Sequence, residues 1–143
     1  MTVLRMAVAA SMLACTASPA QACRGYIPPA GRLAMGHGNN IFSTIALVRI
    51  DEAHYTSAAI GDAHPWRASA TVQNVLSGTY TEDHVRFDRG WGSSACDDGR
   101  PAPEAGSLWV VYFWTHPDGR KLVWITYPAD VAFAADPLLS RPR

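Results

Sequence analysis

LWVVYFW, residues 108–114, is the stretch of sequence that decides the fold. It is a continuous run of apolar and aromatic side chains, and it is short enough to be a strand that is buried on both faces. The turn residues Pro117-Asp118-Gly119 follow it, and KLVWITY, residues 121–127, comes after the turn. A turn of this composition between two such runs predicts a β-hairpin.

Three stretches upstream of the hairpin also have the composition of strands: IFSTIALVRI at 41–50, WRASATVQNVL at 66–76 and HVRFD at 84–88. The first is rich in β-branched residues, the second alternates imperfectly and ends at the turn Ser77-Gly78, and the third alternates cleanly. Together with the hairpin, these stretches predict an antiparallel, all-β domain.

The segments around the strands carry turn signals instead of an amphipathic helix. Residues 23–40 contain several prolines and glycines and are expected to form an irregular entry segment. Residues 51–65 and 97–106 are expected to be loops, and residues 129–139 a short helix. Five or six strands with at most one short C-terminal helix predict a β-barrel or a β-sandwich.

The alternation also predicts which side chains fill the core. We expect one set to face the barrel interior: Val48, Val72, Phe87, Val110, Tyr112 and Ile125. Val111 and Phe113 are then expected on the other face, under a covering loop or helix. A register slip of one residue would invert this assignment. Trp109, Trp114 and Trp124 are expected to pack in the core and at its edge, with an aromatic platform for a sugar or a base as the alternative.

The N-terminus reads as a secretory signal peptide. Arg5 gives a short positive region, residues 6–14 are apolar, and Ala20-Gln21-Ala22 is a cleavage signal. We therefore expect residues 1–22 to be removed, residues 23–143 to form a single domain, and the protein to be secreted or periplasmic. Lipidation at Cys15, which lies in a lipobox-like Met12-Leu13-Ala14-Cys15, or at Cys23 is the alternative.

Two cysteines remain if Cys15 leaves with the signal peptide. An exported chain with an even cysteine count reads as disulfide-bonded, and two cysteines allow only the pair Cys23–Cys96. The bridge would contribute on the order of 4 kcal/mol because it closes a long loop. A pair of reduced, buried thiols is the alternative.

Charge and hydropathy argue against two classes of partner. The chain has 12 Lys+Arg and 12 Asp+Glu and contains no basic run. The sequence therefore lacks the cluster of positive charge that typically contacts nucleic acid or an anionic membrane surface. No stretch approaches the roughly 18 apolar residues of a transmembrane segment. We therefore expect neither nucleic acid nor a membrane span.

The order of these features resembles the netrin-like module, the OB-type barrel of the tissue inhibitors of metalloproteinases and their bacterial relatives. The resemblance covers about residues 23–130, and it is carried by Cys23 and by segments 41–49, 70–78, 85–96, 106–114 and 119–126. It implies a five- to six-stranded OB-type β-barrel, with the first and the later cysteine bonded to each other.

The chain departs from the inhibitors in ways that bear on function. They open with Cys-x-Cys, whereas Gly25 stands at the second cysteine position and no cysteine lies at 126–128. Their smaller second domain is also missing. The resemblance implies that Cys23 would contact a protease zinc and that Arg24 would enter the specificity pocket. The alternative is that Cys23 only fastens the N-terminus to the barrel.

The sequence offers no constellation of catalytic residues. The histidines are not at metal-ligand spacing, so turn positions are their expected role: His37, His54, His64, His84 and His116. Gly-x-Ser-x-Gly and CxxC are absent, and neither serine of Gly92-Ser93-Ser94 has a neighbouring base. We therefore expect no enzyme, no cofactor and no metal.

The function expected from the sequence is non-catalytic binding of a protein or glycan ligand by a secreted domain. The alternative is inhibition of an extracellular zinc metallopeptidase through Cys23-Arg24.

Overall fold

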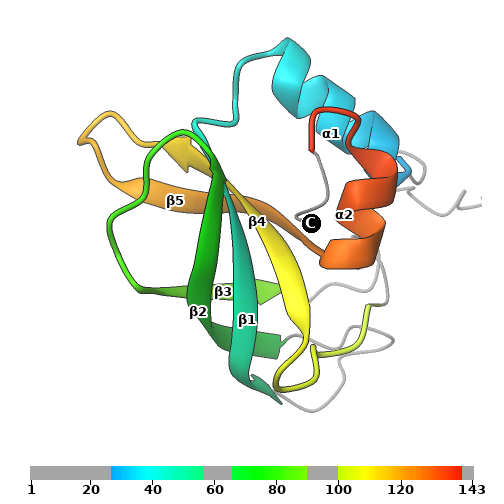
Figure 1. Ribbon diagram of the computed structural model, residues 1–143, viewed down its shortest axis with the longest axis vertical. Coiled ribbons are helices and arrows are strands. Elements are labelled where there is room, and N and C mark those ends of the chain that lie inside the picture. The colour runs from blue at the N-terminus through cyan, green and yellow to red at the C-terminus, as the bar shows by residue number, and fades with distance from the viewer. Residues whose placement is uncertain (1–26, 57–65, 90–99, 140–143) are drawn as a thin grey trace, which may run out of the picture.

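The computed structural model describes residues 27–56, 66–89 and 100–139. In this part of the chain, five antiparallel strands form one sheet with the order β3-β2-β1-β4-β5, and two helices pack against it (Figure 1). The elements are α1 (Pro29–Gly38), β1 (Thr44–Tyr55), β2 (Trp66–Ser77), β3 (His84–Arg89), β4 (Leu108–Thr115), β5 (Lys121–Pro128) and α2 (Ala129–Ala135).

The strand predictions are confirmed, and four of the five strands begin at the predicted residue. The exception is β1, which begins later and continues to Tyr55, through residues that we expected to form a loop. β1 and β2 pair over this whole stretch, from Ile45↔Ser77 to Tyr55↔Trp66, with three register shifts along the way. Pairing with β2 therefore extends β1 beyond the end of its apolar sequence.

The sheet is not closed into the barrel that the sequence predicts. Among the described residues, β3 pairs only with β2 and β5 only with β4, so these two strands are the edges of an open sheet. The local patterns were sufficient to locate each strand. Closure depends instead on whether two edges that are distant in the sequence meet, and no local pattern specifies that.

The entry segment contains a helix, so the prediction of an irregular segment and of a single helix was wrong. Pro29 is the first residue of α1, a position where proline is favourable because its missing N–H has no partner in the helix. A Cβ on Gly36 would lie 2.0 Å from the ring of Phe42. This glycine therefore allows close packing of α1, although in the sequence it reads as a helix breaker. The predicted C-terminal helix is confirmed as α2.

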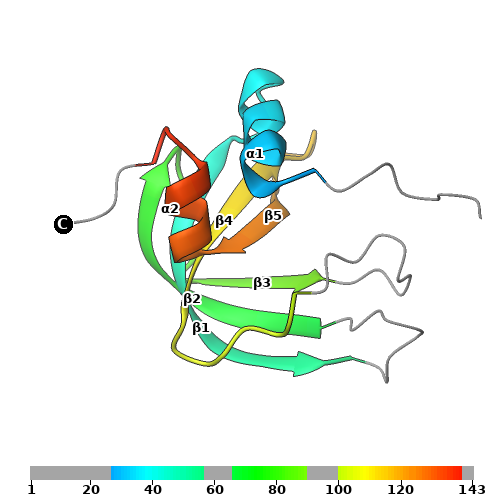
Figure 2. The ribbon, with the colours of Figure 1, turned by 90° about the vertical axis from the view of Figure 1, so that its right-hand side faces the viewer.

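Each face of the sheet carries a hydrophobic core. Val48, Val111 and Phe113 belong to the core on the face away from the helices, which also contains Trp66, Phe87 and Trp109. Leu33 of α1 and Ala132 of α2 cover the opposite face, where their partners include Ile45, Leu47, Val110, Tyr112 and Tyr127. Figure 2 shows the two helices beside each other over β4 and β5.

The predicted phase was right for β1, β2 and β3 and inverted for β4 and β5. Val48 and Phe87 share a core as expected, with Val72 packed against it. Val111 and Phe113 join them, whereas Val110 and Tyr112 lie under the helices together with the partly buried Ile125. A continuous apolar run has no polar alternation that could fix its phase, so the sequence of β4 is equally compatible with either assignment.

Candidate functional site

A cleft of about 430 Å³ lies where the sheet fails to close. Its lining residues come from β3, β4, β5 and the connection that precedes β3: Tyr80, Glu82, His84, Val85, Arg86, Phe113, Lys121, Leu122 and Val123. The volume falls within the range that is usual for ligand sites. Among the described residues, the cleft brings side chains of both edge strands, β3 and β5, to one site.

The interior wall of the cleft is apolar and well packed. Val85 and Phe113 are buried, and Val123 packs against the same core. The ring of Tyr80 stacks on Phe113 with 4.6 Å between centroids and 30° between planes. Burial, reinforced by the nearby Glu82 carboxyl, raises the pKa of Tyr80. The phenol is therefore neutral at physiological pH, and it donates a 3.3 Å hydrogen bond to the backbone carbonyl of His84.

The rim of the cleft is charged. Arg86 extends from β3 and Lys121 from β5, so the two cations belong to opposite edges of the sheet. Lys121 Nζ donates to Ser43 Oγ at 3.0 Å and to Thr115 Oγ1 at 2.8 Å, both neutral acceptors. Within residues 27–56, 66–89 and 100–139, neither cation forms an ion pair with a carboxylate. With Glu82 as the one carboxylate in the lining, the rim has an excess of positive charge.

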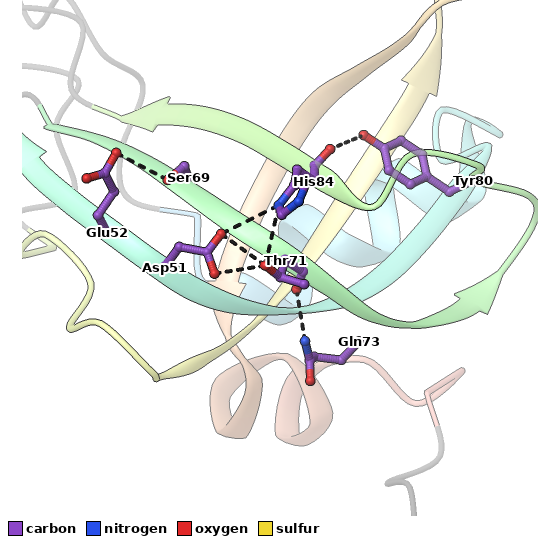
Figure 3. Close-up of polar contacts among 7 residues, drawn as sticks. All are labelled: Asp51, Glu52, Ser69, Thr71, Gln73, Tyr80 and His84. Carbon is purple, nitrogen blue, oxygen red and sulfur yellow. Dashed lines mark hydrogen bonds and ion pairs between the residues drawn. The ribbon is translucent and has the colours of Figure 1, made fainter.

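A polar cluster on β1, β2 and β3 adjoins the cleft at His84 (Figure 3). The hydroxyl of Thr71 lies 2.9 and 3.1 Å from the two oxygens of Asp51, and 3.4 Å from Nδ1 of His84. His84 Nδ1 is 3.7 Å from Asp51 Oδ2. Ser69 and Glu52 make a further contact at 3.5 Å beside this cluster.

This cluster has the composition of a catalytic triad, but its geometry differs from one. Thr71 donates its proton to the carboxylate of Asp51, whereas a nucleophile would donate it to the histidine that acts as base. The side chains of His84 and Asp51 are 71% and 40% exposed, so water solvates both. The cluster therefore joins three neighbouring strands and presents hydrogen-bonding groups, without activating the hydroxyl.

A second polar group is buried under the helices. Asp136, which follows α2, is 1% exposed, and its Oδ2 lies 2.9 Å from His37 Nε2 and accepts a 3.0 Å hydrogen bond from the hydroxyl of Tyr112. Oδ1 accepts from the backbone N–H of Leu138 at 3.0 Å. Burial first, and then the neighbouring Asp136 carboxyl, raises the pKa of Tyr112. These contacts tie α1 and α2 to β4, which is a structural role.

The sequence analysis did not find this group. His37 was expected to be a solvated turn residue, yet it lies on α1 and its partner is 99 positions away. His84 lies on β3 beside Asp51, and His116 lies 2.9 Å from Asp118 in the β4–β5 hairpin. In the described ranges, His, Cys, Asp and Glu side chains do not gather in groups of three or more that could hold a metal ion.

The tryptophans are divided between the core and the surface. Trp109 is 4% exposed, as expected, and its ring centroid lies 5.8 Å from that of Trp66. Trp114 contacts Trp124 edge-to-face at 6.2 Å, and Trp124 is 53% exposed. Trp124 lies next to a register shift in the β4–β5 pairing, at the free edge of β5.

The site residues predicted from the sequence lie outside the described residues. Cys23, Arg24 and Cys96 all belong to these segments, as do the cleavage signal and His64. The disulfide and the zinc contact at Cys23 therefore stay predictions. The cleft and the polar cluster were not foreseen, because both depend on contacts between strands.

No protein-family model, curated protein or solved structure matches this chain. The netrin-like resemblance accordingly stays a prediction. Neither of the two helices in the part of the chain that the structure covers has the length and apolar character needed to cross a membrane.

Proposed function

We propose that this protein is an exported, non-catalytic binding domain and that its ligand enters the cleft between β3 and β5. One observation carries the proposal: in the part of the chain that the structure describes, the two edges of the sheet flank an apolar wall, and the two cations at its rim have no carboxylate partner there. Ligand sites commonly combine an apolar surface with a few polar groups that fix orientation. Arg86 and Lys121 are suited to the second role.

We also propose that the fold is a partly open relative of the OB-type barrel. The OB-fold is a five-stranded, partly open barrel that binds ligands on one face and through its loops. The strand order β3-β2-β1-β4-β5 supports this proposal, because pairing of β3 with β5 would close the sheet. The cleft then occupies the position where that pair would form.

The geometry of the polar residues supports binding over catalysis. The hydroxyl of Thr71 is directed at Asp51, and the Asp51 and His84 side chains are solvated. Hydrogen-bonding groups in this arrangement can orient a ligand beside the cleft at His84. They lack the nucleophile–base pair that group transfer requires.

The test uses the purified protein, immobilised and exposed separately to exported proteins and to extracellular oligosaccharides. Reversal of the rim charge by Arg86→Glu with Lys121→Glu should abolish retention of the ligand. The matched control, Arg32→Glu with Arg49→Glu, makes the same change of net charge outside the cleft and should retain it. Equal retention by both variants would refute the cleft as the site, and chemical conversion of the retained ligand would refute a non-catalytic role.

A further inference from the structure

The two edges that flank the cleft differ in how well they are protected against pairing. β5 begins with Lys121, ends at Pro128 and contains a register shift between its pairs with Tyr112 and Phe113. Lysine, proline and bulges are the devices by which sheet edges avoid further strands. β3 has no proline or lysine, and its pairs with β2 run without a shift from Thr71↔His84 to Trp66↔Arg89. β3 is therefore a regular edge without proline, lysine or a bulge, and its protection comes from the charged side chains of Arg86 and Asp88.

The hydrogen bonds around β3 fix which of its backbone groups face the cleft. The N–H of Val72 donates to the carbonyl of Asp83 at 2.8 Å, so Asp83 directs its backbone groups toward β2. The direction alternates along an antiparallel strand. His84, Arg86 and Asp88 must then direct theirs toward the free edge. The hydroxyl of Tyr80, which also lines the cleft, agrees with this phase because it donates to the carbonyl of His84 (Figure 3). The carbonyl of His84 is therefore already bonded, and an added strand would use the backbone groups of Arg86 and Asp88.

We propose, on the basis of the proposed function, that the ligand is an extended, acidic polypeptide segment that adds to the free edge of β3 as a further strand. An unpaired strand edge recognises a peptide through its main chain and leaves specificity to alternate side chains. Side chains on one face of the added strand would contact Val85, Phe113 and Val123. Those on the other face would lie beside Arg86.

Charge selects the composition of the segment. Arg86 and Lys121 have no carboxylate partner among the described residues, so a glutamate or aspartate opposite Arg86 would form a cross-strand ion pair. Apolar β-branched residues at the alternate positions suit the buried wall. The expected ligand therefore places one acidic residue beside Arg86 and apolar β-branched residues at the positions before and after it. Asp88 lies on the same face of β3 and disfavours a second acidic residue beside itself.

A polypeptide fits this edge better than a glycan does. The backbone groups at the β3 edge recur with the spacing of a strand, which a peptide matches residue by residue. Sugar recognition would instead rely on exposed aromatic faces, and of the two aromatic rings that line the cleft, Phe113 is buried and Tyr80 has one face stacked on it.

The test selects binders from a displayed library of random octapeptides on the immobilised protein. Clones that also bind the Arg86→Glu variant are removed. We expect enrichment of sequences in which an acidic residue is flanked on both sides by β-branched residues. The synthetic peptide of the leading clone should bind Arg49→Glu like the unmodified protein and Arg86→Glu about tenfold or more weakly, because attraction is replaced by repulsion.

N-methylation of the peptide backbone tests strand addition itself. A methyl group on every second amide should abolish binding in one phase and leave it largely unchanged in the other, because only alternate amides face β3. Equal effects in both phases, or no enrichment over a blank support, would overturn the inference. The natural ligand could instead prove to be a glycan that the double variant Arg86→Glu with Lys121→Glu fails to retain. In that case the inference of strand addition is wrong, while the proposed function is upheld.

Discussion

The helix-covered face of the sheet and the β3–β5 cleft treat their polar groups in opposite ways. Under the helices, Asp136 is buried and its carboxyl oxygens are satisfied by His37, Tyr112 and the backbone of Leu138. At the β3–β5 cleft, the cations at the rim have no carboxylate partner in the described part of the chain. Burial makes an unpaired group costly, whereas water compensates an exposed one. The first region is therefore expected to govern stability and the second to be available for a ligand.

The largest expected effect is the loss of the buried carboxyl group. Asp136→Ala would leave the Tyr112 hydroxyl and His37 Nε2 without their partner in a buried site, and should lower the free energy of unfolding by about 3 kcal/mol. Urea unfolding followed by tryptophan fluorescence measures it. The control is Asp51→Ala, which removes an exposed carboxylate and should cost less than about 1 kcal/mol. Equal losses in both variants would contradict the distinction between the regions.

The second prediction concerns how closely α1 packs on the chain beside it. Gly36→Ala places a methyl group 2.0 Å from the Phe42 ring, so the ring or the helix must move, and we expect a loss of about 1–3 kcal/mol. Gly38→Ala is the matched control in the same helix, because nothing lies within 4 Å of its added Cβ. It should be neutral or stabilising by up to about 1 kcal/mol, owing to the higher helix propensity of alanine. If Gly36→Ala is as stable as Gly38→Ala, the tight contact of α1 is absent.

A comparison of β3 with α1 shows where the sequence is sufficient to predict an element and where it is not. The start of β3 was predictable because Val85 and Phe87 alternate with polar residues, and such alternation is local. α1 was missed because Pro29 and Gly36 were read as breakers, although one begins the helix and the other admits Phe42. A glycine that is required by a neighbour cannot be distinguished in the sequence from one that interrupts an element.

The candidate site could not be predicted for a related reason. Its walls come from β3 and β5, whose failure to pair is a property of the whole sheet. The inverted phase of β4 has a different origin, since Val110 to Phe113 are fully buried and either face suits them. For β4, the burial of the strand could thus be read from the sequence, but which of its faces meets which core could not.

The third prediction is a dependence on alkaline pH. Burial raises the pKa of Tyr112 in the folded protein, so above about pH 10 the unfolded chain loses a proton that the folded chain keeps. Stability is therefore fully present below pH 10 and should fall as the pH rises, by up to about 1.4 kcal/mol per pH unit from this group. Urea unfolding between pH 8 and 11 measures the slope. Tyr112→Phe should be less stable at neutral pH and should show a shallower alkaline decline; an unchanged slope would argue against a neutral, buried phenol.

The smallest expected effect is at the cleft. Among the described residues, Arg86→Gln removes a charge that forms no ion pair, and Lys121→Gln removes one whose bonds are to the hydroxyls of Ser43 and Thr115. Arg86→Gln should change the free energy of unfolding by less than about 0.5 kcal/mol, as is usual for surface substitutions without partners. Lys121→Gln gives up two hydrogen bonds to neutral hydroxyls and should cost about 1 kcal/mol or less. The same two variants should weaken retention of the ligand, so binding and stability would separate at this edge of the sheet. A loss of 2 kcal/mol or more in either variant would show that these cations hold the fold together, and would remove the reason to regard them as available for a ligand.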